Sequence, residues 1–540
     1  MKTKICKNCP NNFDLSEGDL SYYEEMKVPE PTFCPDCRQQ RRLAWRNERK
    51  LYVRKCNGTG ETILSVYSEE KPFQIYKNEY WYSDKWDALT YGRDFDFNRP
   101  FFEQFKELMH SVPQLALSTV NNQNCDYVNQ CGWCKDSYLI FEADFDEKCF
   151  YSSYIYDSKD CVDNVHCYQS ELCYECTDVR NCYNLRFSQN CNTCSDSWFL
   201  KNCIGCSNCF GCVNLRNKQY YIYNKPYSKE GYVKQMETYN LIDVGSLQEF
   251  RQDFSEYSKQ FPHKYLYGVQ NENSTGDYMF NTQNCEQCFD INNAQDCKYI
   301  HNSRFIKKVH DMSTFGSKGG TEFCYENHEI GGARAGVRNI CFSDQIWEGC
   351  CDIFYSKLCQ QNSHDLLGCV GLRKAAHCIF NKQYSKDEYE VLRNKLIEHM
   401  KKTEEWGEFF PISLSPYGYN ETLAQDYFPL SKEEALVKGY KWKDEEMKPT
   451  QAPTKELLLC PKCSKNFKLV NHELAFYQKQ NLPPPLSCPD CRHKVRMSLR
   501  NPRKLWKRHC KQCEAPFETS YAPDRPEPIY CENCYLKLVD

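Results

Sequence analysis

The chain has 540 residues, too many for one hydrophobic core, so three or more domains are expected. Its formal net charge of −4 gives no overall signal for a polyanion partner, and no run of 18 apolar residues predicts a membrane span. The first residues, MKTKICKNCP, lack the apolar segment of a secretory signal. We therefore expect a cytoplasmic protein whose 38 cysteines stay reduced and either bind metal or fill a core.

The two ends of the chain carry the same cysteine pattern. CKNC at 6–9 and CPKC at 460–463 are each followed, after 24 residues, by CPDC. The second pattern lies 454 positions after the first, and the same ungapped offset continues as far as Tyr76, which matches Tyr530. The ends are therefore copies of one module of about 75 residues.

A second cysteine set follows the first, and only the C-terminal copy keeps it complete, from Cys510 to Cys534. The N-terminal copy retains Cys56 alone, so its second site is expected to be degenerate. Two C-x2-C pairs place four sulfurs around one ion and leave no position for water, which predicts structural zinc, with iron or disulfides as alternatives. The predicted ligands are Cys6, Cys9, Cys34, Cys37, Cys460, Cys463, Cys488, Cys491, Cys510, Cys513, Cys531 and Cys534.

The first half of each copy resembles a known domain. C-x2-C, then Phe13, Tyr22-Tyr23 and CPDCR at 34–38 is similar to the small probable zinc-ribbon domain of bacterial proteins, and the C-terminal copy fits the same pattern. The glycine that usually follows the first cysteine pair is absent from both copies. The whole layout resembles long ribbon-flanked proteins of uncultivated small-genome bacteria. The resemblance implies bound zinc and no particular activity.

A basic segment follows CPDC in each copy. Residues 38–55 hold eight Lys or Arg and one acid, and residues 492–511 hold nine and no acid. Arginine interleaved with aromatic residues is typical of phosphate contact and base stacking, which predicts binding to structured RNA or the ribosome. The alternatives are a solvated face, or arginines that pair with anionic zinc–thiolate centres. The predicted nucleic-acid-binding residues are Arg38, Arg41, Arg42, Arg46, Arg49, Lys50, Arg54, Arg492, Lys494, Arg496, Arg500, Arg503, Lys504, Trp506, Lys507 and Arg508.

Fifteen cysteines between 125 and 212 are all separated by multiples of three residues. Neither a helix nor a single strand has this period, whereas a parallel β-solenoid has it if each corner returns an inward position, with coils of 12, 15 or 18 residues. Asn precedes several of these cysteines, which suits turns. The densest run, NCIGCSNCFGCVNL at 202–215, departs from the ferredoxin pattern in its last gap, so its sulfurs are predicted to fill a core.

The solenoid is itself duplicated, because GCVNLRNKQYYIYNKPYSKEGY at 211–232 lies 157 positions before GCVGLRKAAHCIFNKQYSKDEY at 368–389. A helix is predicted before each solenoid, at 99–112 and from Ser246 to Phe261, and another after Ser385, which forms a capping box with Glu388. The predicted fold class is mainly β, with two tandem parallel β-solenoid domains that have capping helices and are flanked by small zinc-ribbon modules.

Five segments are predicted in chain order: ribbons at 1–95, solenoids at 96–240 and 241–402, a strap and hinge at 403–455, and tandem ribbons at 456–540. Within the strap, a short helix near 431–438 is expected to be capped by Ser431, and MKPTQAPT is expected to be a flexible hinge. The glycine-rich stretch at 316–336 lacks the Walker order and is expected to be a long loop.

No catalytic motif is evident, since G-x-S-x-G, G-x-G-x-x-G and H-E-x-x-H are absent. We predict a non-enzymatic, zinc-binding architectural protein that binds structured RNA or the ribosome through its basic segments and has no membrane partner. One alternative is a protein–protein scaffold with a protein partner on the solenoid. The other is a β-helix enzyme acting on polysaccharide, for which the acids near the solenoid corners are Asp144, Asp146, Asp157, Asp160 and Asp163.

Overall fold

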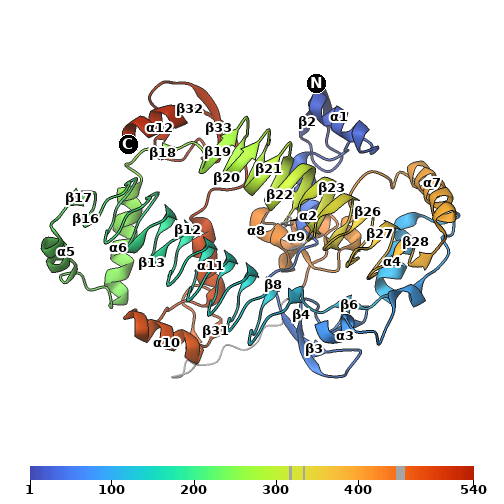
Figure 1. Ribbon diagram of the computed structural model, residues 1–540, viewed down its shortest axis with the longest axis horizontal. Coiled ribbons are helices and arrows are strands. Elements are labelled where there is room, and N and C mark those ends of the chain that lie inside the picture. Colours follow the sequence, from blue (N-terminus) through green and yellow to red (C-terminus); the bar gives the residue numbers. More distant parts are fainter. Residues whose placement is uncertain (315–318, 332–334, 445–456, 540) are drawn as a thin grey trace. The chain divides into compact units, whose positions relative to one another are not determined.

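The computed structural model describes residues 1–314, 319–331, 335–444 and 457–539. The chain divides into two compact units. Unit 1 contains Met1–Leu117 and Leu266–Asp444, and unit 2 contains Ser118–Tyr265 and Glu445–Asp540. Each unit therefore joins one solenoid to the ribbon module at the other end of the chain, and Figure 1 shows the blue N-terminal helix α2 against the yellow-green strands of unit 1. The compact units differ from the contiguous domains expected from the sequence.

Solenoid A, residues 118–222 of unit 2, advances by 12 residues per coil, as shown by Asn129 opposite Phe141 and Ser153 opposite Val165. The predicted parallel β-solenoid is confirmed, with the shortest coil that the period of three allowed. Its strands, and the hairpin that ends it, are β7 (Thr119–Val120), β8 (Asn129–Gly132), β9 (Phe141–Asp144), β10 (Ser153–Tyr156), β11 (Val165–Tyr168), β12 (Thr177–Arg180), β13 (Tyr183–Arg186), β14 (Gln189–Asn192), β15 (Ser195–Trp198), β16 (Tyr221–Ile222) and β17 (Lys225–Pro226).

Every third residue of solenoid A, from Asn121 to Tyr223, has a positive φ, between 45° and 64°. From Tyr127 to Gly211, the residue that follows each such corner is buried, which explains the cysteine spacing and gives four inward positions per coil. Asn181 and Asn202 occupy corners directly before cysteines, since Asn tolerates left-handed backbone. At the corner residue Gly205 a Cβ would lie 2.2 Å from the Asn217 side chain, so here only glycine fits without displacing a neighbour.

Cysteine, serine and aliphatic side chains fill the inside of solenoid A. Cys149, Cys161 and Cys173 occupy the same inward position in successive coils and are fully buried. Inward serines satisfy the backbone of the next coil, as where Cys149 N donates to Ser137 Oγ at 3.1 Å. Among the described residues, no group of metal-binding side chains with ligand atoms within 4.8 Å of one another includes these cysteines. The run at 202–215 is therefore part of this core.

Substituting Ile155 by alanine should lower the free energy of unfolding by about 2–5 kcal/mol, because the side chain is fully buried and its removal leaves a cavity in the core. Ile204 is 37% exposed on the outside of the same solenoid and provides the matched control, with an expected loss below about 1 kcal/mol. Urea unfolding followed by hydrogen exchange in β10 measures both. Equal losses would contradict the assignment of inward and outward positions.

Solenoid B, residues 266–383 of unit 1, is less regular than solenoid A. Paired strands are offset by 11 residues at Gly268 and Met279 and by 16 at Thr321 and Val337. Its strands are β19 (Gly268–Glu272), β20 (Gly276–Gln283), β21 (Cys288–Gln295), β22 (Lys298–Ser313), β23 (Thr321–Ile330), β24 (Val337–Cys341), β25 (Asp344–Ile346), β26 (Cys351–Phe354), β27 (His364–Leu367), β28 (Ala376–Ile379) and β29 (Lys382–Gln383).

The long loop expected at 316–336 is wrong for its central part, because residues 321–330 form strand β23. Ile306 pairs with Thr321 and Thr321 with Val337, so the parallel ladder continues through β23. The glycine-rich residues 315–318 and 332–334 lie outside the described part of the chain.

Helices cover the last coil of each solenoid. In unit 2, Phe210 packs on Phe250 of α6 (Val244–Ser258), next to α5 (Lys229–Met236). In unit 1, Phe380 packs on Phe101 of α4 (Phe101–Ser111), and α7 (Lys386–Lys402) contacts β28. The helix predicted at 99–112, before the first solenoid, thus caps the last coil of the second solenoid. Its apolar face packs against apolar side chains at that end, such as Phe380. Helix α6 begins after Asp243, whose carboxylate accepts a hydrogen bond from the expected cap, Ser246.

The predicted capping boxes of Ser385 with Glu388 and of Ser431 with Glu434 are present. The expected strap passes over solenoid B, where Trp406 packs on Tyr355. The hinge expected at 447–454 lies outside the described residues. The strap contains η2 (Ile412–Leu414), η3 (Tyr419–Glu421), α8 (Leu423–Tyr427) and α9 (Lys432–Val437). No helix in the described ranges is long and apolar enough to cross a membrane.

The ribbon modules are built alike. The N-terminal module contains β1 (Lys2–Ile5), β2 (Asn12–Leu15), α1 (Glu17–Glu25), α2 (Pro35–Leu43), β3 (Tyr52–Lys55), β4 (Thr62–Ser65), β5 (Ile75–Tyr76), α3 (Asn78–Trp81) and η1 (Ala88–Tyr91). The C-terminal module contains β30 (Leu458–Leu459), β31 (Asn466–Phe467), α10 (Asn471–Gln480), α11 (Pro489–Ser498), β32 (Trp506–His509), β33 (Pro516–Thr519), β34 (Ile529–Tyr530) and α12 (Glu532–Val539). Each module pairs one short strand with the segment that leads into a solenoid, β5 with β6 (Gln114–Leu115) and β34 with β18 (His263–Lys264).

Candidate metal centres and the arginine helices

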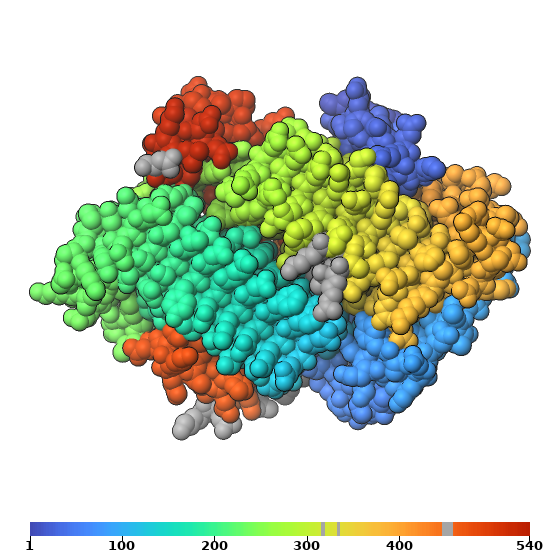
Figure 2. Space-filling view, viewed as in Figure 1, coloured from blue at the N-terminus to red at the C-terminus, as the bar shows by residue number. Residues whose placement is uncertain are grey.

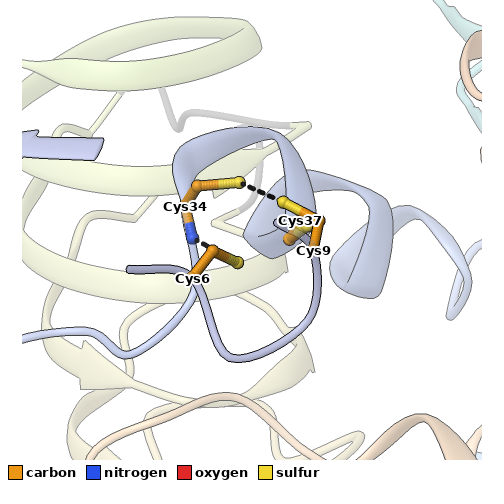
Figure 3. Close-up of side chains that lie close together, drawn as sticks. All are labelled: Cys6, Cys9, Cys34 and Cys37. Atoms are coloured by element: carbon orange, nitrogen blue, oxygen red, sulfur yellow. Dashed lines mark hydrogen bonds between the residues drawn. The ribbon is translucent and has the colours of Figure 1, made fainter. Parts of the chain in front are cut away.

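The first cysteine cluster joins the turn between β1 and β2 to the start of α2. The turn supplies Cys6 and Cys9, and the helix supplies Cys34 and Cys37 (Figure 3). The sulfurs of Cys9 and Cys34 lie 3.7 Å apart, and all four lie within 4.8 Å of one another. A tetrahedral ion with Zn–S bonds of about 2.3 Å separates its sulfurs by about 3.8 Å, so the four side chains fit such an ion.

Backbone N–H groups point at the first sulfur of this cluster. The N–H groups of Cys34 and Asn8 donate to Cys6 Sγ at 3.2 and 3.4 Å. Burial alone would raise the pKa of Cys6, but the backbone donors outweigh it and lower the pKa to about 7. The same kinds of donor lower the pKa of Cys460 and Cys510, against burial, to about 6. These donors favour a thiolate, the form that binds metal, at the first cysteine of each quartet, whereas neighbouring cysteine side chains raise the pKa of Cys34 and Cys534.

The two clusters of the C-terminal module repeat this geometry. The sulfurs of Cys463 and Cys488 lie 3.6 Å apart in one cluster, and those of Cys513 and Cys531 lie 3.7 Å apart in the other. In each cluster all four sulfurs lie within 4.8 Å of one another. The structure therefore brings together all three predicted cysteine quartets. Zinc as the ion remains a prediction.

The degenerate site of the N-terminal module keeps the shape of a metal site. The N–H of Lys77 donates to Cys56 Sγ at 3.3 Å, just as the N–H of Cys531 donates to Cys510 Sγ at 3.4 Å in the complete copy. The ring of Tyr80, which replaces the fourth cysteine, packs against the turn that follows Cys56. An aromatic ring thus takes over the packing in this copy.

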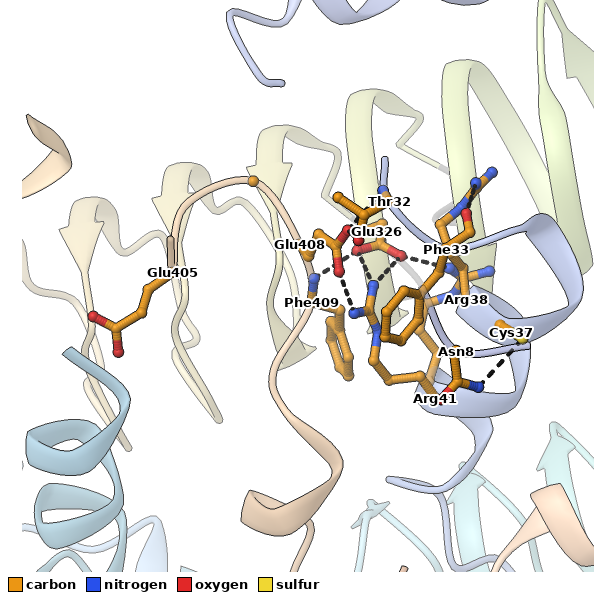
Figure 4. A network of polar contacts seen from close by, with 12 residues as sticks. Asn8, Thr32, Phe33, Cys37, Arg38, Arg41, Glu326, Glu405, Glu408 and Phe409 are labelled. Carbon is orange, nitrogen blue, oxygen red and sulfur yellow. Dashed lines mark hydrogen bonds and ion pairs between the residues drawn. The ribbon is translucent and has the colours of Figure 1, made fainter. Parts of the chain in front are cut away.

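The arginine segment of the N-terminal module is buried, not solvated. Helix α2 lies against β22 and β23, and Arg38 and Arg42 both pair with Asp311, at 2.9 and 3.2 Å. Arg41 binds Glu326 and Glu408 at 2.8 and 2.7 Å (Figure 4). The three arginines are at most 4% exposed. Carboxylates of the solenoid and the strap therefore neutralise them.

The C-terminal module docks on solenoid A with the equivalent residues. Arg492 and Arg496 of α11 pair with Asp163, at 3.2 and 2.8 Å, and Arg500 pairs with Asp178 at 3.0 Å. The arginines lie 454 positions after Arg38, Arg42 and Arg46 of the N-terminal module. The first two arginines of each set therefore share one solenoid aspartate in the same way, whereas Arg46 binds Glu48 of its own module where Arg500 binds Asp178.

Aromatic stacking strengthens the equivalence. The guanidinium carbon of Arg38 lies 5.1 Å from the ring centroid of Tyr299, and that of Arg492 lies 4.7 Å from the ring of Tyr151. Tyr299 follows Tyr151 by 148 positions, the same offset that separates Asp311 from Asp163. The sequence analysis did not identify these tyrosine and aspartate partners of the arginines, and it considered Asp163 only as an acid at a solenoid corner. The internal offset of 148 residues is a signal that could have identified them.

Half of the predicted nucleic-acid-binding residues are corrected by their burial, because they face protein groups rather than solvent. Arg46 binds Glu48 at 2.6 Å, and Arg54 donates to the Ser68 carbonyl at 2.9 Å. The corrected residues are Arg38, Arg41, Arg42, Arg46, Arg54, Arg492, Arg496 and Arg500. The half-buried ones are Arg49, Arg503, Trp506 and Arg508, and the exposed ones are Lys50, Lys494, Lys504 and Lys507.

No family model and no curated protein matches this chain. The likeness of its ends to zinc ribbons therefore depends on the cysteine spacing and on the quartet geometry. The cysteine quartets lie in the same modules as the buried arginine helices. In each first ribbon, the cysteine that begins the second pair is also the residue before the arginine helix, Cys34 before α2 and Cys488 before α11.

Proposed function

We propose that the chain is a non-enzymatic scaffold. In each unit a metal-loaded ribbon docks on a solenoid and holds it as a rigid binding platform. The observation that supports this proposal is the repeated docking of an arginine helix on solenoid carboxylates, by Arg42 on Asp311 and by Arg496 on Asp163. Since a metal cluster holds the start of each helix, the metal has a structural purpose in this arrangement. Eight of the arginines that suggested RNA instead make contacts inside the protein.

The outer surface of a solenoid suits a scaffold because its side chains repeat at the spacing of the coils. Successive coils form parallel ridges in Figure 2, most clearly in the teal solenoid A. On this surface Trp133 and Phe145 stack with ring centroids 5.1 Å apart, and Asn184 donates to Asp196 of the next coil at 2.8 Å. Regular surfaces of this kind present an extended area to a macromolecular partner.

The polysaccharide-cleaving alternative loses support at two of its five acids. Asp163 pairs with two arginines, and Asp146 is buried inside the solenoid, where it accepts a hydrogen bond from Ser158 N at 2.8 Å. Burial raises the pKa of Asp146 well above its usual range, as expected for a carboxyl group inside the core. Neither carboxyl group is placed to reach a substrate.

RNA or ribosome binding is the second candidate function. It is supported by the exposed lysines Lys494, Lys504 and Lys507 of the C-terminal module, with the Lys504 ammonium 5.5 Å from the ring centroid of Trp506. A basic surface with an aromatic ring is suited to phosphate contact and base stacking. The scaffold proposal uses the same surface only for solubility.

Gel shifts of the full chain with structured RNA, at about 50 and about 200 mM salt, separate the two functions. The scaffold proposal predicts no shift and predicts protein partners that remain bound in the native complex after nuclease treatment. A shift that weakens with salt, and that is lost when Lys494, Lys504 and Lys507 become glutamate, would support RNA binding instead. Three exposed lysines of unit 2, Lys225, Lys229 and Lys234, provide the charge-reversal control.

A further inference from the structure

Two histidines and an aspartate meet on the outside of solenoid B, far along the chain from the cysteine clusters. His364 begins β27, Asp365 follows it, and His377 lies in β28 of the next coil. Since His364 pairs with Ala376, Asp365 and His377 are directly opposite each other in the parallel ladder. Neighbouring strands lie about 4.8 Å apart, a distance that one ion can bridge.

The donor atoms of the three side chains converge. His364 Nδ1 lies 2.8 Å and His377 Nε2 lies 3.6 Å from the same carboxylate oxygen, Oδ2 of Asp365. One ligand atom from each residue lies within 4.8 Å of the other two. All three side chains are between 26% and 43% exposed, which leaves a path for an ion and open coordination positions on the solvent side.

We propose that His364, Asp365 and His377 form a fourth metal site, which binds a divalent transition-metal ion such as Zn²⁺, Co²⁺ or Ni²⁺. Two imidazoles and one carboxylate are donors that such ions prefer, whereas Ca²⁺ and Mg²⁺ prefer oxygen alone. The site differs in kind from the cysteine quartets because its three ligands leave positions open to water or to a donor group from a partner. It does not depend on the proposed scaffold function.

The preceding coil adds negative charge beside the site. Cys351 is opposite His364 in the ladder, and Asp352 follows it. Asp352 and Asp365 thus occupy matching positions in adjacent coils, and a bound cation would offset the repulsion between their carboxylates.

A simple surface ion pair between a histidine and an aspartate is the competing explanation. Such a pair contributes at most about 1 kcal/mol and requires only one histidine. Here two histidines from adjacent coils approach the same carboxylate oxygen. The matching positions of solenoid A, 157 residues earlier, are Ser207, Asn208 and Tyr220, so the ligand set is not a by-product of the repeat.

Titration of the full chain with Zn²⁺, after its ribbons are loaded and weakly held ions are dialysed away, tests the proposal. We expect one additional equivalent in the wild type, and its affinity should fall by more than about 100-fold in His377→Asn. With Co²⁺, the additional ion should lack the sulfur-to-cobalt charge-transfer absorption that the cysteine quartets give, because its donors are nitrogen and oxygen.

His472→Asn is the matched control, since His472 is an exposed histidine of the C-terminal module outside every four-cysteine cluster. It should keep the additional equivalent. Circular dichroism of both variants verifies that the solenoid remains folded. An unchanged stoichiometry in His377→Asn, equal losses in the two variants, or no additional equivalent in the wild type would overturn the fourth site, and none of these outcomes bears on the scaffold function.

Discussion

Substituting Asp163 by asparagine should weaken the docking of the C-terminal ribbon on solenoid A by about 3–5 kcal/mol. The variant removes the carboxylate that Arg492 and Arg496 share, at 5% and 1% exposure respectively, while Arg492 keeps its pair with Glu473 at 3.1 Å. Removing one carboxylate from a buried ion-pair network costs several kcal/mol, whereas removing an exposed carboxylate costs little. Hydrogen exchange of the α11 amides and urea unfolding of the full chain measure the loss, and α11 should exchange before the solenoid does.

Two further variants decide whether charge is the cause. Asp157→Asn removes an exposed carboxylate from the same solenoid and should change stability by less than about 0.5 kcal/mol. A double variant, Asp163→Leu with Arg496→Met, keeps the Arg492–Glu473 pair and should lose less than Asp163→Asn alone, because apolar groups can replace a buried ion pair at little cost. Equal behaviour of Asp163→Asn and Asp157→Asn would contradict the docking described here.

Substituting Cys37 by serine should remove one of three tightly bound ions and unfold the first ribbon. Four thiolates around zinc contribute about 10–16 kcal/mol in small ribbons, more than so small a core supplies. Because Cys37 lies in the first turn of α2, loss of the ion should also release Arg38, Arg41 and Arg42 from solenoid B. Elemental analysis per chain gives the ion count, and limited proteolysis of residues 1–43 gives the unfolding.

Cys56→Ser is the control for that experiment, because Cys56 is equally buried but lies in the site that lost its other cysteines. It should leave both the ion count and the protease resistance of α2 unchanged. A full ion count in Cys37→Ser, or an equal loss in Cys56→Ser, would contradict the assignment of the quartet.

The cysteine quartets and the solenoid could be predicted from the sequence because both are set by spacing. Two sulfurs three residues apart can reach one ion wherever the module lies, and a corner at every third residue follows from local backbone geometry. The capping boxes at Ser385 and Ser431 were predictable for the same reason. Each of these features involves residues close together in the chain.

The arginine partners and the order of packing could not be predicted in this way. Arg42 and Asp311 are 269 residues apart, and nothing in the local pattern of either residue names the other. The sequence of an arginine cluster does not indicate whether its counter-charge comes from phosphate or from aspartate. Likewise, nothing in the apolar pattern of α4 indicates which solenoid it covers, and only long-range packing places it against Phe380.

The exchange of partners between the two ends also constrains how a ribosome can make this protein. The N-terminal module emerges first, but Asp311 follows Arg42 by 269 residues, which at about 5–20 residues per second means a delay of roughly 10–50 s. During that interval the carboxylates that later pair with Arg38, Arg41 and Arg42 have not yet been made, so the nascent ribbon must stay soluble without them. The first ribbon therefore cannot complete this docking until solenoid B has been made, and early capture of metal would keep the ribbon folded until the acceptor strands appear.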